Sequence, residues 1–202
     1  MTEIVSGQKK HPMTEKSCDS KNPSRVIMIY PEQGVSGVYV RHMPLSLLYA
    51  SVELVQNNFD VKLLDTRVHK KDWQEKLKEL LTDDTLLVGI SVMSGQPIKN
   101  AIQIGRYVKS LVADIPIVWG GPHATFKPKS ILEGEWSCDY VVGGYASKTF
   151  HQLCLKIQKG EQPKGIGGIC WRHEGVIKQN PLIEKKFEYI EYDKIPYHLI
   201  DD

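Results

Sequence analysis

The sequence predicts a doubly wound α/β fold, in which helices cover both faces of a five-stranded parallel sheet with the flavodoxin-like strand order 2-1-3-4-5. Short, unbroken apolar runs recur along the chain and are typical of strands that are buried on both faces. Between these runs lie segments whose apolar residues recur at helical spacing. Because right-handed crossovers place the connecting helices against the sheet, this alternation indicates a parallel sheet with helices on both sides.

Each element of this domain has its own signal in the sequence. The first strand, 26–30, is an apolar run that ends at Pro31, and the helix after it, 44–58, begins with a proline and carries one apolar face. By the same patterns, further strands are expected at 61–64, 86–91, 115–119 and 139–142. Further helices are expected at 73–81, 97–113 and 150–157.

The C-terminal part of the chain has a different pattern. Two short apolar runs, 169–173 and 176–178, flank Glu174-Gly175 and predict a β-hairpin, which an extended linker containing Pro196 follows. The N-terminal segment is polar and has no periodic pattern, which indicates a disordered tail. The expected organisation is therefore a tail over 1–24, an α/β domain over 25–160, and a hairpin with a linker over 161–202.

Composition excludes several classes of protein. The 202 residues are 41% hydrophobic and 25% charged, with a net charge of +2, which argues against nucleic acid as the main partner. The longest apolar run, 115–119, is far shorter than the about 20 residues that span a bilayer, and the N-terminus has no secretory signal. We therefore expect a cytoplasmic protein without a membrane partner. Its four cysteines form no C-x-x-C pair and predict no metal site.

Candidate binding residues follow four of the predicted strands. Ligands of such folds lie beyond the carboxyl ends of the strands, and small residues there leave room for a ligand, although glycines that merely form turns are the alternative in any single loop. The candidates are Gly34, Ser36 and Gly37 after the first strand; Ser91, Met93, Ser94, Gly95 and Gln96 after the third; Gly120, Gly121, Pro122, His123 and Thr125 after the fourth; and Gly143, Gly144 and Tyr145 after the fifth.

The common phosphate-binding and nucleophile motifs of α/β proteins do not fit these loops. The chain has no G-x-x-x-x-G-K-[ST] loop, and Gly34 with Gly37 gives only a fragment of a dinucleotide fingerprint. A nucleophile elbow requires G-x-S-x-G, and neither Ser91 nor Ser94 has both glycines. A receiver domain would carry an aspartate at the end of the third strand, where this chain has Ser91. No catalytic residue is predicted.

The loops after the third and fourth strands resemble those of the cobalamin-binding Rossmann-like domain. That family carries Ser-x-Leu at the end of the third strand and Gly-Gly after the fourth. Here Ser91-Val92-Met93 stands for the first element and Gly120-Gly121 for the second, with residues 94–119 between them. The run from Gly120 to Thr125, together with 138–144, is similar to the N-terminal cobalamin-binding domain of cobalamin-dependent radical SAM enzymes. The similarity extends over roughly 25–200.

The resemblance implies that cobalamin binds in its base-off form. The nucleotide tail would then enter between the first and third strands, with Ser91 near the dimethylbenzimidazole base and Gly120-Gly121 along the tail. Residues 93–96 would face the lower side of the corrin, and His123 would donate a hydrogen bond to the tail. One branch of the family provides a histidine ligand to cobalt after the first strand, but residues 31–41 contain no histidine. The resemblance therefore implies binding without a histidine ligand.

The resemblance also implies a larger parent protein. We expect the cobalamin-binding domain of a radical SAM enzyme, a methyltransferase, whose fused catalytic domain binds S-adenosylmethionine and a 4Fe-4S cluster. The chain has no C-x-x-x-C-x-x-C motif, so the cluster is not expected in this part, and the chain alone is not expected to catalyse. Two alternatives remain, a free-standing cobalamin carrier or sensor, and a flavodoxin-like module for another ligand such as flavin mononucleotide.

Overall fold

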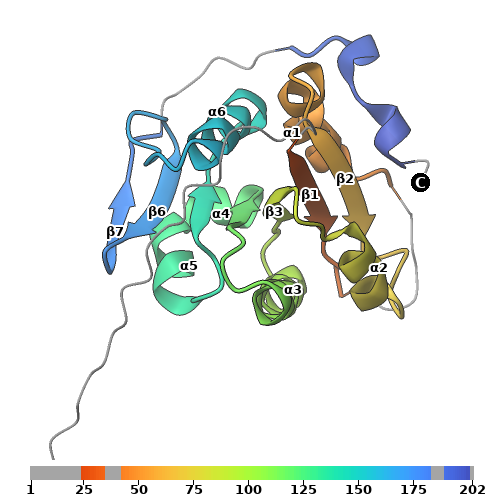
Figure 1. Cartoon of the computed structure of the whole chain (residues 1–202), viewed down its shortest axis with the longest axis horizontal. Helices are drawn as coiled ribbons and strands as arrows, with labels where there is room; N and C mark the ends of the chain where they lie inside the picture. The colour runs from red at the N-terminus through yellow and green to blue at the C-terminus, as the bar shows by residue number, and fades with distance from the viewer. Residues whose placement is uncertain (1–23, 35–41, 183–188, 201–202) are drawn as a thin grey trace, which may run out of the picture.

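A computed structural model describes residues 24–34, 42–182 and 189–200. Its strands form one seven-stranded sheet in the order β2-β1-β3-β4-β5-β6-β7 (Figure 1). The strands are β1 (Arg25–Tyr30), β2 (Asp60–Asp65), β3 (Thr85–Ser91), β4 (Ile117–Gly120), β5 (Tyr140–Val142), β6 (Ile169–His173) and β7 (Val176–Gln179). The helices are α1 (Leu45–Gln56), α2 (Trp73–Leu80), α3 (Gln96–Leu111), α4 (Pro122–Phe126), α5 (Pro128–Gly134) and α6 (Ser147–Gln158), with 3-10 turns η1 (Tyr192–Lys194) and η2 (Tyr197–Ile200).

The first five strands are parallel and confirm the predicted order 2-1-3-4-5. The predicted hairpin is also present, and it extends the same sheet because β6 pairs antiparallel with β5. Glu174 and Gly175 both have positive φ at its turn, as expected for a tight turn that follows the twist of the strands. The predicted tail, 1–24, lies outside the described residues except for Ser24. None of the helices in the described ranges is both long and apolar enough to cross a membrane.

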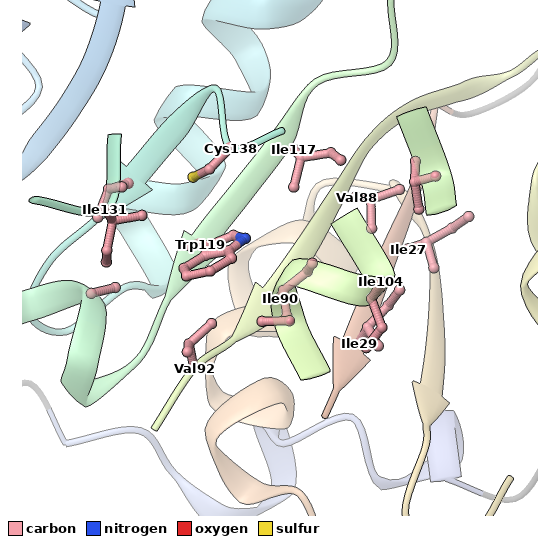
Figure 2. Packing of buried hydrophobic residues seen from close by; sticks show 14 of the residues in the cluster. Ile27, Ile29, Val88, Ile90, Val92, Ile104, Ile117, Trp119, Ile131 and Cys138 are labelled. Atoms are coloured by element: carbon pink, nitrogen blue, oxygen red, sulfur yellow. The ribbon is translucent and has the colours of Figure 1, made fainter. Parts of the chain in front are cut away.

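Helices α2 to α5 cover one face of the sheet, and α1 and α6 cover the other (Figure 1). Side chains of a strand alternate between these faces. In β3, Val88 and Ile90 join Trp119 of β4 in the core under α2 to α5 (Figure 2). Leu87 packs toward α1 and α6 instead. The two residues that follow it at a spacing of two, Gly89 and Ser91, therefore face α1 and α6 as well.

The sequence did not predict the short helices α4 and α5. They contain five and seven residues, too few for an apolar periodicity to show, and they occupy a stretch that reads as a loop after the fourth strand. Each begins with a proline, Pro122 or Pro128, whose fixed φ suits the first turn of a helix. Because α4 starts directly after β4, the predicted site residues His123 and Thr125 lie on a helix.

An ion pair between a buried carboxylate and a half-exposed guanidinium ties the end of α5 to α3 at the amino-terminal edge of the sheet. The Glu135 side chain is only 4% exposed, and its Oε2 lies 2.9 Å from the Arg106 guanidinium. The backbone N–H of Ser137 donates a second hydrogen bond to the same carboxylate. Burial opposes ionisation of this carboxyl group, but the hydrogen bonds from Arg106 and Ser137 outweigh it, so the pKa of Glu135 lies below its ordinary value.

The lowered pKa of Glu135 makes a signed prediction for stability. The ionised carboxylate stabilises the fold above the ordinary pKa of 4.5, and this contribution is lost as the pH falls through the lower pKa of the folded state. Replacing Glu135 by Gln should therefore cost about 1 kcal/mol at pH 7 and much less in acid, measured by urea unfolding. Exposed Glu133, replaced by Gln, is the control. A cost that stays constant with pH would contradict this reading.

A close contact between α3 and the segment before β5 gives a second prediction. A β-carbon on Gly105 would lie 2.6 Å from the Oγ of buried Ser137. Gly105→Ala should therefore destabilise the protein by about 1–3 kcal/mol in thermal or urea unfolding, and Ser137→Ala in the same chain should restore most of the loss. Gly134, whose β-carbon would meet nothing within 4 Å, provides the control variant Gly134→Ala. Unchanged stability of Gly105→Ala would show that the Ser137 side chain or α3 can move aside at no cost.

Candidate functional site

The candidate site lies where the parallel strands end. The pairing of β3 with β4 places Ser91 beside Gly120, and Tyr30 and Val142 end the flanking strands on the same face of the sheet. Tyr30 and Val142 are buried large residues, whereas the two positions between them carry a hydroxymethyl group and no side chain. The row of strand-end residues that these four form therefore has large side chains at its two ends and little side-chain volume in its middle. It lies on the face of the sheet that α1 and α6 cover.

Ser91 meets a serine that the sequence did not single out. Its Oγ lies 3.2 Å from the Oγ of Ser46, in the first turn of α1. Ser91 is 7% exposed and Ser46 is exposed, so this pair of hydroxyl groups connects the strand end with the surface. The two residues are 45 positions apart and share no motif, which is why only the fold reveals their contact.

The two glycines at the end of β4 have different roles. The nearest neighbour of a β-carbon on Gly120 would be the carbonyl oxygen of Val142, 3.9 Å away, so this position is open. Gly121 has a φ of +93°, and its β-carbon would lie 3.0 Å from both the N and the O of Val92. It would also lie 3.2 Å from Ser91 Oγ. Gly121 therefore allows the close approach of two backbones, and Gly120 leaves room.

The space beside Ser91 has a defined floor. Gly89 precedes Ser91 by two residues in β3 and faces the same side of the sheet. A β-carbon on Gly89 would lie 2.9 Å from Met28 Sδ and 3.2 Å from Phe150 Cζ. The side chains of Met28 and Phe150, from β1 and α6, thus fill the place that Gly89 leaves empty. These two side chains close this face of the sheet two residues before Ser91, and Met28 is the more adaptable of the two.

Hydrogen bonds connect three of the predicted loops. His123 Nδ1 lies 3.1 Å from Ser94 Oγ, which joins the loop after β3 to α4. The Thr125 hydroxyl donates to the carbonyl oxygen of Gly121 and accepts from the N–H of Gly144, which joins α4 to the loop after β5. The structure therefore brings together predicted residues from three strand ends, and it places them at one edge of the sheet.

The loop after β1 is arranged differently. A β-carbon on Gly34 would lie 2.1 Å from Cγ of Gln96, so the bare side of this glycine is covered by a side chain at the start of α3. The Asn100 side chain donates to the carbonyl oxygen of Glu32, 2.6 Å away, and holds the same segment to α3. Gly34 thus packs the loop against a helix. Predicted residues Ser36 and Gly37 lie outside the described residues.

Exposed apolar side chains surround this edge. Tyr145 is 68% exposed and Met93 is 44% exposed, and both were predicted site residues. Pro122 and Gly95 lie on the exposed side of the same loops. Four further apolar residues beside the strand ends were not predicted as site residues. Leu45 was counted with the apolar face of the first helix, and the other three belong to no periodic pattern in the sequence. These exposed residues are Met43, Leu45, Phe126 and Leu182. Together with Met93 and Tyr145 we call them the apolar rim.

Comparison with known proteins identifies the family. Residues 35–154, more than half of the chain, match the family model described as the B12 binding domain. The chain belongs to the B12-binding domain family. The predicted flavodoxin-like fold and the predicted family are thereby confirmed. The matched region includes the ends of β3, β4 and β5, the serine pair and α4 described above, and it ends within α6.

Relatives of this B12-binding domain are larger proteins. It is 28% identical over 138 residues to an uncharacterized methyltransferase, PH0819, from Pyrococcus horikoshii, and the match covers 68% of this chain and 30% of that protein. The fold is similar to that of TsrM from Kitasatospora setae, a radical S-adenosylmethionine methyltransferase solved with cobalamin and a [4Fe-4S] cluster bound, with a TM-score of 0.69 and 22% identity. That match covers 83% of this chain and 30% of TsrM.

A second solved protein has the same fold. OxsB, a cobalamin-dependent S-adenosylmethionine radical enzyme solved with aqua-cobalamin and S-adenosylmethionine bound, matches with a TM-score of 0.65 and 21% identity. The match covers 87% of this B12-binding domain and 24% of OxsB. The chain therefore spans about a third or less of the length of the relatives it matches.

The different roles of the two glycines can be tested by stability alone. Gly121→Ala places a β-carbon against the Val92 backbone at a φ that L-residues rarely adopt, so we expect a loss of about 1–3 kcal/mol of unfolding free energy. Gly120→Ala should change stability by less than about 0.5 kcal/mol. Chemical denaturation of the two variants measures the difference. Equal losses would show that the tight contact is not specific to Gly121.

Proposed function

We propose that this B12-binding domain holds cobalamin base-off at the carboxyl edge of its sheet, with the nucleotide tail beside Ser91 and Gly120. The open position at Gly120, next to a serine hydroxyl and on the face between α1 and α6, is the observation that carries the proposal. A flat aromatic base needs a place without a side chain, and a hydroxyl group can hydrogen-bond to its ring nitrogen. Family membership supports the choice of ligand.

The residues at this edge fit both parts of cobalamin. The apolar rim offers exposed carbon surface to the corrin, a large ring with a mainly apolar body. Ser94 and His123 offer polar groups where the tail leaves the ring. Residues Ser91, Ser94, Gly120, Gly121 and His123 would hold the tail, and Met93, Gly95, Gln96, Gly143, Gly144 and Tyr145 would face the ring.

We further propose that no histidine of the loop after β1 ligates cobalt, since residues 31–41 contain none. His42 follows that loop, and its carbonyl oxygen accepts a hydrogen bond from Arg67 while its ring meets Tyr30 edge-on. Bound cobalamin supplies a cobalt centre that can accept and donate a methyl group. The contribution of the chain is to orient the cofactor and to shield its lower face from water.

The proposed parent is a cobalamin-dependent radical SAM methyltransferase. The coverage of about 30% of PH0819 and of TsrM supports a domain within a longer protein. In such a parent, S-adenosylmethionine and a 4Fe-4S cluster would be bound outside this chain, which lacks a C-x-x-x-C-x-x-C motif. The α/β domain over 25–160 would hold the cofactor, and 161–202 would lead from the sheet toward the catalytic domain.

The proposal is tested by adding hydroxocobalamin to the purified chain and removing free corrinoid by desalting. We expect about one corrinoid per chain, seen in the visible spectrum. Gly120→Leu fills the open position and should weaken binding by about 10-fold or more, because overpacking costs about 1–3 kcal/mol. Gly134→Leu, at a glycine of α5 with nothing within 4 Å, is the matched control. Loss of all corrinoid from the wild-type chain, or equal binding by Gly120→Leu, would contradict the proposal.

A further inference from the structure

We infer that Ser46 is a positioning residue, which directs the Ser91 hydroxyl toward a ring nitrogen of the tail base and so makes this domain selective for corrinoids that carry such a base. The inference rests on the proposed function and names what the serine pair recognises. Its starting point is the 3.2 Å contact between Ser46 Oγ and Ser91 Oγ, which joins α1 to the end of β3.

The two hydroxyl groups have unequal surroundings. Ser91 is 7% exposed, and its strand neighbour Gly120 has no side chain. Ser46 is exposed in the first turn of α1. A hydroxyl group has one proton to donate and can accept two hydrogen bonds. When Ser46 donates to Ser91, the proton of Ser91 is free to point away from α1. The open position at Gly120 lies next to it.

This arrangement matches an aromatic base with an unprotonated ring nitrogen. Such a nitrogen accepts a hydrogen bond and offers no proton, so it needs a donor that is not already used elsewhere. The relay from Ser46 to Ser91 to the base supplies that donor, and each hydrogen bond in such a chain polarises the next. A corrinoid without a nucleotide tail would not use this relay.

Contacts at the ends of β1 and β2 fix the position of Ser46. Arg67, which follows β2, pairs with Asp65 at 2.6 Å and donates to the carbonyl oxygen of His42, just before α1. Its guanidinium also stacks on Tyr30, 4.2 Å from the ring centroid. These contacts hold the start of α1 beside the ends of β1 and β2. A serine in its first turn therefore has a defined place relative to Ser91.

The inference is tested by comparing the affinities for cobalamin and cobinamide, which has the corrin ring but no nucleotide tail. Ser46→Ala should weaken cobalamin binding on the order of 5-fold, the typical effect of one hydrogen bond, and leave cobinamide binding unchanged. Ser46→Thr keeps the hydroxyl group and should restore the affinity for cobalamin. Ser110→Ala, which removes an exposed hydroxyl group of α3, is the control.

The outcomes separate this inference from the proposed function. Failure of the wild-type chain to bind either corrinoid would overturn the proposed function and the inference with it. Wild-type binding with an unchanged ratio of the two affinities in Ser46→Ala would overturn the inference alone. An equal loss for cobalamin and cobinamide would also overturn it, because that result assigns Ser46 a general structural role. A selective loss that Thr restores would support it.

Discussion

The ends of β3 and β4 approach so closely that only a glycine fits at residue 121, and the candidate site depends on this contact. A β-carbon there would lie 3.0 Å from the N and O of Val92. Two hydrogen bonds fix the approach, from the Val92 N–H to the carbonyl oxygen of Gly120 and from the His123 N–H to the carbonyl oxygen of Val92. The chain therefore turns into α4 directly at the strand end, and Gly120 keeps an open side toward α1 and α6.

Alternation along the strands separates stability from binding. Residues such as Ile90 and Trp119 point toward α2 to α5 and are almost completely buried, so they contribute to the largest core. Their neighbours Ser91 and Gly120 point to the opposite face, where they leave space at the sheet edge. The same two strands thus supply packing residues to one face and an open position to the other. A change at the open position of Gly120 can therefore affect a ligand with little cost to the fold.

The fold was predictable because its signals are periodic and local. Apolar runs and helical spacing located the strands and the long helices. The predicted glycines do lie at the carboxyl edge of the sheet, and that a ligand binds there stays a prediction. The short helix α4 has too few residues for such a signal. Contacts between distant segments could not be predicted from the sequence either. Ser46 contacts Ser91 only in the folded chain, and the sequence around a glycine does not show which side chain packs against it. Gly34 shows this, because Gln96 covers the side that the sequence suggested was open to a ligand.

The nucleotide tail of cobalamin is proposed to enter the sheet edge between α1 and α6. The most direct measurement is a crystal structure of the chain grown with cobalamin. We expect the base next to Gly120, with its ring nitrogen within hydrogen-bond distance of Ser91 Oγ and the corrin over the apolar rim. A base still coordinated to cobalt above the sheet, or a corrinoid bound at the amino-terminal edge, would contradict it.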